Sequence, residues 1–305
     1  MMIPEFLTDN DSIGIVSTAR FITKKELQPA IDFLNQLGLN VVTGKNLFNR
    51  NNQFAGNDQE RLEDFQYMID NPKIKAILCA RGGYGTVRII DHLDFTLFLG
   101  NPKWIIGYSD VTVIHNHINQ LLQIPTIHAS MPINFPTNTR NTMDAFGETI
   151  KGERKEYTVH ANVIRIGKTK SEIIGGNLSI IYSLMGSKSQ IKTDGKILFI
   201  EDIDEMLYHI DRMMIALDRA NMLSNLTGLI VGGMTNMRDN TKVFGFSTDN
   251  GYGQTAEQII WHYVKDFDYP ICFAYPAGHQ KKNLPLILGM ECNVDFQKNS
   301  VHIDY

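Results

Sequence analysis

The eight residues KWIIGYSD (103–110) decide the fold that we expect for this chain. A short apolar run ends there on a Gly-x-Ser corner, and the amphipathic segment VTVIHNHINQLL (111–122) follows at once. A strand that turns sharply into a helix lifts Ser109 out of the sheet, and the first free helix amides point toward negative charge beside it. This corner is typical of a nucleophilic serine. Asp110 and Val111 depart from the full G-x-S-x-G pattern, however, and a Ser-Asp pair before a helix is also an ordinary cap.

Apolar runs alternate with amphipathic segments around this corner. We predict strands at residues 12–17, 39–42, 76–80 and 104–108, and helices at 24–37, 58–70 and 87–93. Strands this apolar need cover on both faces, so the first half indicates an α/β fold with a parallel, flavodoxin-like sheet. Ligands of such sheets gather at the carboxyl ends of the strands, where the loop RGGYG (81–85) and Ser109 would lie.

The second half of the chain is more mixed. Periodicity weakens and charge rises from about residue 138 to residue 170. We therefore predict an N-terminal nucleophile domain at 1–140, a crossing segment at 141–170 and a smaller mixed α/β C-terminal domain at 171–305. Its strands are expected at 158–166, 171–174, 196–200, 228–232 and 270–274, its helices at 177–185, 208–222 and 255–267, and a closing hairpin through 286–290 and 300–303.

Composition limits the possible functions. The 305 residues carry a net charge of -4 and are 43% hydrophobic and 20% charged, as in a globular enzyme. Clustered Lys and Arg are missing, so no nucleic-acid partner is expected. The start MMIPEF resembles no leader, and no run reaches the roughly 18 apolar residues of a membrane span, so we expect a cytoplasmic protein without a membrane partner. The three distant cysteines, Cys79, Cys272 and Cys292, are predicted to lie in the core.

Two further polar residues follow predicted strands. Glu201 comes directly after KILFI (196–200), and His279 follows PICFAYPAG (270–278). A serine needs an imidazole to accept its proton, and the imidazole needs a carboxylate to fix its tautomer, so Ser109, His279 and Glu201 would supply a complete triad. From spacing alone, a helix-capping Glu201 and a structural His279 explain the same residues.

The loop RGGYG favours the catalytic interpretation. Consecutive glycines let backbone amides approach a ligand closely, as an oxyanion hole requires. Its glycines do not match the G-x-G-x-x-G dinucleotide pattern, and GKT (167–169) lacks the rest of a phosphate loop, so no nucleotide cofactor is expected. We find no His-x-x-x-His or Glu-rich spacing for a metal either.

Six blocks in one order add up to a resemblance. They are CARGGYG (79–85), GYSD (107–110), IGGNL (174–178), LFIED (198–202) with YHIDR (208–212), YPAGH (275–279) and NLPL (283–286). This set, spread over residues 13–289, resembles that of the LD-carboxypeptidases, the muramoyltetrapeptide carboxypeptidases, which are related to microcin-immunity serine hydrolases.

The resemblance implies a metal-independent serine peptidase that removes the terminal D-alanine from murein tetrapeptides during cytoplasmic cell-wall recycling, usually as a homodimer. It assigns Ser109 as nucleophile, His279 as general base and Glu201 as orienting acid. It also implies that the amides of Asp110 and of Gly82 or Gly83 form the oxyanion hole.

We nominate further groups to hold substrate carboxylates, because an arginine offers a bidentate fork. They are Arg81, Tyr84 and Arg212. Arg212 could instead pair with Glu205 or Asp211 on its own helix.

Two alternative functions and three unknowns stay open. A microcin-immunity-type hydrolase would cut aminoacyl-nucleotide amides, using an added loop with aromatic groups, whereas Trp104 and Trp261 lie in core-like segments. A catalytically silent protein would bind murein peptides without cutting them. The sequence does not identify the diamino acid before the D-alanine, the glycine amide that faces the oxyanion, or the formation of the dimer.

Overall fold

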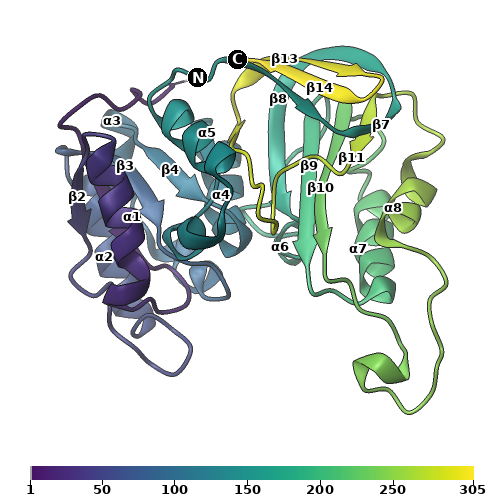
Figure 1. Cartoon of the computed structure of the whole chain (residues 1–305), viewed down its shortest axis with the longest axis horizontal. Helices are drawn as coiled ribbons and strands as arrows, with labels where there is room; N and C mark the ends of the chain where they lie inside the picture. Colours follow the sequence, from purple (N-terminus) through teal and green to yellow (C-terminus); the bar gives the residue numbers. More distant parts are fainter. Residues whose placement is uncertain (1) are drawn as a thin grey trace.

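The computed structural model describes residues 2–305, and its strands form two sheets with helices packed on them (Figure 1). The six-stranded sheet has the order β12-β5-β4-β3-β1-β2. Strands β1 to β5 run parallel in the 2-1-3-4-5 order of flavodoxin-like sheets, as predicted, and β12 pairs antiparallel with β5. These strands are β1 (Ser12–Val16), β2 (Asn40–Thr43), β3 (Ile74–Cys79), β4 (Trp104–Gly107), β5 (Thr126–His128) and β12 (Leu286–Leu288).

Helices bury both faces of this sheet. Ile77 and Ile105 point into a core shared with α2, α3 and α4, whereas their neighbours Leu78 and Ile106 point into a core shared with α1 and α5. Capping boxes begin both α1 and α2. The helices are α1 (Lys24–Gln36), α2 (Asp58–Asp70), α3 (Thr96–Gly100), α4 (Thr112–Leu122) and α5 (Arg140–Ile150). We call this sheet with α1–α5 the first lobe.

The eight-stranded sheet is mixed and has the order β6-β14-β13-β8-β9-β10-β11-β7. Strands β8 to β11 run parallel at its centre, and one face is covered by α6, α7 and α8. The elements are β6 (Glu156–His160), β7 (Asn162–Arg165), β8 (Gly167–Asn177), β9 (Ile197–Ile203), β10 (Gly228–Thr235), β11 (Ile271–Phe273), β13 (Glu291–Gln297), β14 (Ser300–Asp304), α6 (Leu178–Ser183), α7 (Leu207–Arg219) and α8 (Ala256–Val264). We call this sheet with its helices the second lobe.

Three predicted elements differ from the structure. The helix at 87–93 is replaced by two short 3-10 turns, η1 (Thr86–Arg88) and η2 (Ile90–His92), and neither has a side-chain cap at its start. The hairpin through 286–290 and 300–303 was wrong: β12 pairs with β5 across the lobes, and the hairpin is β13–β14. The strand at 158–166 is split into β6 and β7, which lie at opposite edges of the sheet.

The predicted crossing segment 141–170 holds most of α5, then β6, β7 and the start of β8. The domain boundaries themselves stay predictions. All three cysteines are buried and free, which confirms their core assignment.

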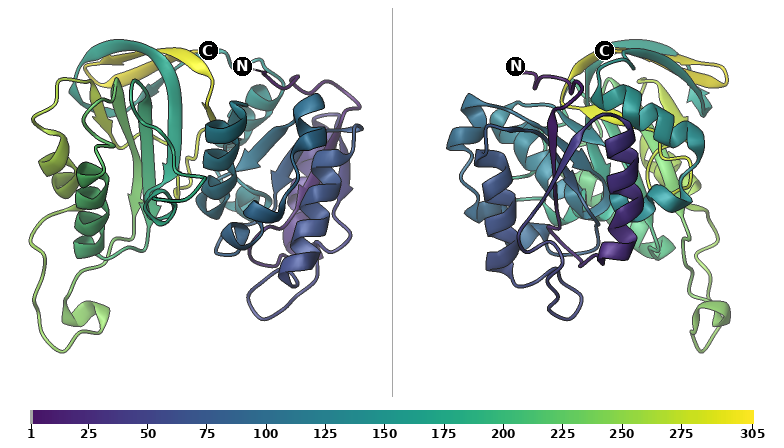
Figure 2. Two further views of the ribbon diagram at one scale, coloured as in Figure 1. Left: turned by 180° about the vertical axis from the view of Figure 1, so that it is seen from behind. Right: turned by 60° about the vertical axis from the view of Figure 1, so that its left-hand side comes forward.

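A long segment projects from the second lobe. It comprises residues 236–254, between β10 and α8, and includes the turn η5 (Lys242–Phe244) (Figures 1 and 2). Val243 at its tip is 87% exposed. Within residues 2–305, no helix combines the length and apolar character of a membrane span.

Candidate active site

Ser109 lies where β4 ends and the turn η3 (Ser109–Val111) leads into α4. Its φ of +63° is in the left-handed region, which costs a non-glycine residue about 1 kcal/mol or more. A serine held in this conformation between a strand and a helix matches the predicted corner, and such local strain is concentrated at functional sites. The hydroxyl is thereby presented at the carboxyl edge of the parallel sheet.

Glu201 and His279 form a close pair in the second lobe. Nδ1 of His279 donates to Glu201 Oε2 at 2.7 Å, and the backbone N–H of His279 donates to the same oxygen at 3.1 Å. Asn177 Nδ2 donates to the other carboxylate oxygen at 3.3 Å. The Glu201 side chain is fully buried, so these three hydrogen bonds orient both the carboxylate and the imidazole.

Burial and pairing oppose each other at these two groups. Burial alone would raise the pKa of Glu201, but the charge and hydrogen bonds of His279 hold that pKa below its usual value. Burial would lower the pKa of His279, whereas the carboxylate of Glu201 raises it above its usual value. The pair therefore favours a carboxylate beside an imidazole that readily accepts a proton.

Glu201 occupies a position different from the predicted one. It lies inside β9, not after its end, because the pairing of β9 with β10 continues to Ile203. The close approach of the turn before His279 explains how a strand residue reaches it: Gly278 has a φ of +102°, and a Cβ there would lie 2.6 Å from Glu201 Oε2. Only glycine fits this contact.

The glycine loop lies beside Ser109. A Cβ on Gly82 would be 3.1 Å from Ser109 Oγ, so the Gly82 backbone passes directly by the hydroxyl. The carboxylate of Asp110 accepts a hydrogen bond from the Thr86 amide at 2.9 Å and thereby ties the serine corner to the end of the loop. Gly83 lies against the side chain of Arg20. The Gly82 backbone and Asp110, the next residue after Ser109, thus lie close to the serine.

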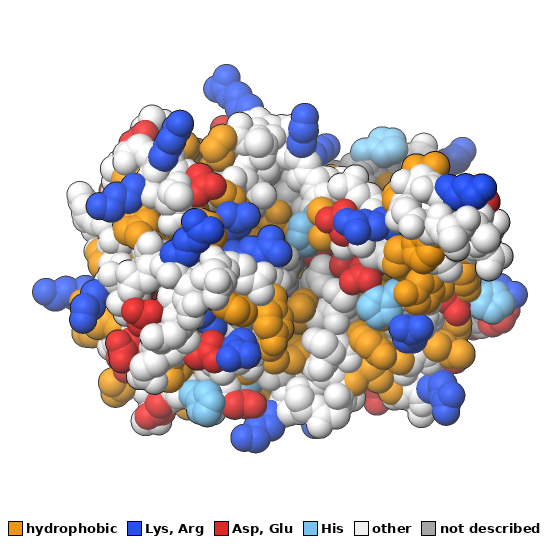
Figure 3. Space-filling view, turned by 90° about the horizontal axis from the view of Figure 1, so that it is seen from below, with side chains coloured by type: hydrophobic (Ala, Val, Ile, Leu, Met, Phe, Trp, Pro, Cys, Tyr) orange, Lys and Arg blue, Asp and Glu red, His pale blue; other side chains and the backbone are white. Residues whose placement is uncertain are grey.

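Residues of both lobes line a cavity of about 410 Å³ near the carboxyl edge of the parallel sheet. Tyr108, the neighbour of Ser109, packs its ring 4.8 Å from the imidazole of His279. The lining residues are Tyr108, Asn134, Thr137, Asn138, Ile203, Thr235, Asn236, His279, Gln280 and Lys281. Figure 3 views the molecule from this side and shows the groove between the lobes.

The nominated carboxylate-binding residues do not line this cavity. Arg81 lines a separate cavity in the first lobe, and Tyr84 is 45% exposed near Phe54. Arg212 lies on α7 with its guanidinium 5.2 Å from the ring of Tyr208. Among residues 2–305 it makes no ion pair, so neither predicted helix partner holds it.

The first of those partners, Glu205, pairs with His209 at 2.5 Å. The second, Asp211, accepts a hydrogen bond from Tyr263 at 2.7 Å. Both carboxylates are therefore engaged elsewhere.

Buried polar residues around the pair escaped the sequence reasoning. His128, at the end of β5, is fully buried with its ring 4.9 Å from Phe199, and burial lowers its pKa to about 4. Burial and the charge of Glu201 raise the pKa of Asp202 to about 7. Asn177, which bridges both carboxylates, lies in the quoted IGGNL block, the one available signal.

Histidines on α4 do not join the site. His115 Nε2 contacts the Gly107 carbonyl at 2.9 Å, and burial lowers its pKa to about 3. His117 contacts Ser189 Oγ at 2.9 Å. Within the described range 2–305, no group of three or more His, Cys, Asp or Glu residues is arranged to hold a metal ion.

Comparisons with known proteins cover both lobes. Residues 13–129 match the family model of the LD-carboxypeptidase N-terminal domain, and residues 170–294 match that of the LD-carboxypeptidase C-terminal domain. A probable murein peptide carboxypeptidase of Bacillus subtilis is 32% identical over 99% of this chain and 94% of its own.

Solved structures show the same fold. The muramoyltetrapeptide carboxypeptidase of Oxalobacter formigenes superposes with a TM-score of 0.82 at 24% identity, over 96% of this chain and 98% of its own. MccF in complex with glutamyl sulfamoyl guanosine gives a TM-score of 0.86 at 20% identity, over 99% and 98% of the two chains.

Proposed function

This chain belongs to the LD-carboxypeptidase family, and from that membership and its site we propose a metal-independent serine peptidase that removes the terminal D-alanine from murein tetrapeptides. The observation that carries the proposal is the pairing of His279 with the fully buried Glu201 at 2.7 Å, with the imidazole 4.8 Å from the ring of Tyr108, the residue before Ser109. A cap or a structural histidine would not need a buried carboxylate that accepts two hydrogen bonds from one residue.

In the proposed reaction, Ser109 Oγ attacks the scissile carbonyl carbon while His279 takes the hydroxyl proton. The imidazolium then returns this proton to the amine of the departing D-alanine, and water hydrolyses the acyl-enzyme by the same route. Glu201 holds the imidazole tautomer and stabilises its charged form. The carboxylate remains ionised throughout, in agreement with its lowered pKa.

Backbone amides would stabilise the oxyanion of each tetrahedral intermediate. Gly82 lies beside the serine and is followed by Gly83, and Asp110 comes directly after Ser109 in the turn η3. Each well-placed donor contributes about 3 to 4 kcal/mol to the transition state. Because Gly82 passes closest to Ser109 Oγ, we assign it the main loop contribution.

We further propose a cytoplasmic role in murein recycling and a homodimeric assembly, as the family resemblance implies. Sedimentation of the purified chain tests the assembly. Fractionation of the producing cells tests the location.

The decisive experiment measures free D-alanine released from an L,D-linked tetrapeptide by the wild type and by Ser109→Ala, with a chelator present. We expect release by the wild type and none by the variant. Lysine and diaminopimelate peptides are assayed side by side, which also identifies the diamino acid. A well-folded wild type that releases nothing from either peptide would overturn the proposal.

One observation supports testing aminoacyl-nucleotide amides in the same assay. The relatives that cut such compounds carry an aromatic loop, and here Phe244 and Phe246 are 46% and 42% exposed on the projecting segment 236–254. Of the two tryptophans, Trp104 is fully buried in the first lobe. Hydrolysis of an aminoacyl sulfamoyl nucleoside, with no D-alanine release, would favour this alternative. Binding of the tetrapeptide without either reaction would favour the silent binding protein.

A further inference from the structure

A second cavity, of about 350 Å³, lies beside the glycine loop in the first lobe and is lined by three arginines. The other lining groups are an aromatic ring and two amides, so all the charge at this cavity is positive. The lining residues are Arg20, Phe21, Arg50, Asn52, Gln53 and Arg81. They come from three separate segments, which the fold brings together.

The arginine stems are held in place. The guanidinium of Arg50 stacks 4.3 Å from the ring centre of Phe21, and its Nε donates to the Asn52 carbonyl at 3.2 Å. Arg81 Nη1 donates to the Phe21 carbonyl at 3.4 Å. Positioned guanidinium groups lose less conformational freedom when they bind an anion than free ones do.

These charges have no carboxylate partner. Among residues 2–305, none of the three arginines forms an ion pair, although the chain as a whole is acidic with a net charge of -4. The nearby carboxylate of Glu26 accepts two hydrogen bonds from Thr23. Those bonds and, more weakly, the charge of Arg81 lower the pKa of Glu26, but no contact joins the two side chains.

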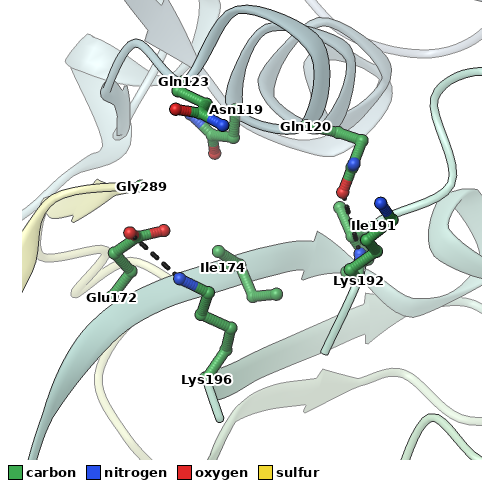
Figure 4. A pocket seen from close by; sticks show the side chains of 9 residues that line it. All are labelled: Asn119, Gln120, Gln123, Glu172, Ile174, Ile191, Lys192, Lys196 and Gly289. Atoms are coloured by element: carbon green, nitrogen blue, oxygen red, sulfur yellow. Dashed lines mark hydrogen bonds and ion pairs between the residues drawn. The ribbon is translucent and has the colours of Figure 1, made fainter. Parts of the chain in front are cut away.

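A pocket between α4 and β8 shows how a cation in a cavity can be paired with a carboxylate of the same chain. This cavity of about 290 Å³ also contains lysines, but Lys196 is paired with Glu172 at 3.0 Å inside it (Figure 4). It also lies at the last turn of α4, the end away from Ser109. One of the two lysines there is thus neutralised by the fold, whereas none of the three arginines of the arginine cavity forms an ion pair within residues 2–305.

The arginine cavity adjoins the catalytic loop. Arg81 directly precedes Gly82, which passes by Ser109, and the side chain of Arg20 packs against Gly83. Lys and Arg side chains gather on this face of the first lobe, next to the groove between the lobes (Figure 3). A ligand at the serine could therefore extend over the glycine loop into the cavity.

We propose that Arg20, Arg50 and Arg81 form an anion subsite that binds a carboxylate of the peptide substrate. This inference rests on the proposed function for the identity of the ligand, and it adds Arg20 and Arg50 to the residues expected from the sequence. A murein tetrapeptide offers carboxylates of two kinds: those that the lysine and diaminopimelate peptides share, which include that of the terminal D-alanine, and the side-chain carboxylate that only diaminopimelate carries.

The test compares the wild type with Arg50→Gln and Arg20→Gln, using Lys25→Gln as the matched control. Lys25 is exposed on the same lobe and does not line the cavity, so its replacement removes one charge without changing the subsite. Steady-state D-alanine release is measured on lysine and diaminopimelate tetrapeptides. We expect each arginine variant to raise KM about 10-fold with kcat within about 2-fold, and the control to change neither.

The two peptides identify the source. A rise in KM at least five-fold larger for the diaminopimelate peptide assigns the subsite to the side-chain carboxylate, whereas equal rises assign it to a carboxylate that both peptides share. KM values of both arginine variants that match the control on both peptides would overturn the proposal.

Failure of the proposed function is detected separately. If the wild type releases no D-alanine, calorimetric titration of the tetrapeptides into Ser109→Ala, with and without Arg50→Gln, still measures the subsite. Binding that weakens about 10-fold with the arginine replaced supports the subsite without catalysis. Equal binding, or none, refutes it.

Discussion

Replacement of Glu201 by glutamine tests the catalytic assignment most directly. The carboxylate accepts the Nδ1–H of His279 at 2.7 Å in a fully buried setting, and glutamine keeps the shape while removing the charge. A hydrogen bond to a charged group contributes about 1.5–3 kcal/mol, and each pKa unit corresponds to about 1.4 kcal/mol. The pKa of His279 should therefore fall in Glu201→Gln, because the charge that raises it is removed.

The direction of the pH effect follows from the role of the imidazole. A general base is active when neutral, so kcat/KM falls as the pH drops below its pKa. In the wild type that pKa lies above the ordinary histidine value, because Glu201 stabilises the charged ring against the effect of burial. In Glu201→Gln the acidic limb should move to lower pH, while the plateau drops by about 10⁴-fold through loss of tautomer control and imidazolium stabilisation.

Asp202→Asn is the matched control. Asp202 is the next residue of β9, is also buried, and shares the Asn177 amide, but it makes no hydrogen bond to His279. The assay is D-alanine release below KM from pH 4.5 to 9, with folding checked by circular dichroism. We expect the control to keep its plateau within about 10-fold. A Glu201→Gln enzyme with wild-type plateau and limb would refute the assignment.

Three further predictions concern the serine, its loop and metals. Gly82→Ala places a methyl group 3.1 Å from Ser109 Oγ, so kcat should fall about 100-fold or more while the melting temperature shifts by less than about 4 °C; an active variant would remove the loop from the oxyanion hole. The free energy of unfolding of Ser109→Gly should exceed that of Ser109→Ala by about 1 kcal/mol, because glycine accepts the φ of +63° without strain. Equal free energies of unfolding in denaturant would argue against strain at the corner. Chelation should leave D-alanine release unchanged within about 2-fold, and a loss that zinc restores would contradict the metal-independent mechanism.

Local sequence patterns predicted the serine corner well. The apolar run before Ser109 and the amphipathic segment after it are contiguous, so period and turn chemistry were sufficient to indicate a strand and a helix. The parallel sheet followed from strands too apolar to have a solvated face. The position of Glu201 within β9 could not be predicted, because strand length there depends on the register with β10.

Long-range pairings were outside the reach of local patterns. The run at Leu286–Leu288 is equally compatible with a hairpin partner in its own lobe and with β5, and only the packed structure selects β5. Arg20 and Arg50 line one cavity with Arg81, and the segments that carry them meet where Arg20 pairs with Phe54 in an isolated bridge, which no periodicity indicates. Nothing in the local sequence set His128 apart, and its complete burial near Glu201 is visible only in the structure.

The division of the site between two lobes makes its geometry depend on how firmly the lobes are joined. Thr112, at the start of α4, accepts a hydrogen bond from the backbone N–H of Asn177 at 3.0 Å through its hydroxyl oxygen. The side-chain amide of Asn177 in turn donates to Glu201. The segment that carries His279 continues into β12, which is hydrogen-bonded into the sheet of the first lobe. Both second-lobe residues are therefore tied to the serine's own lobe by short connections. A hinge that opened the groove would have to break these contacts, so we infer that substrate enters a largely preformed site.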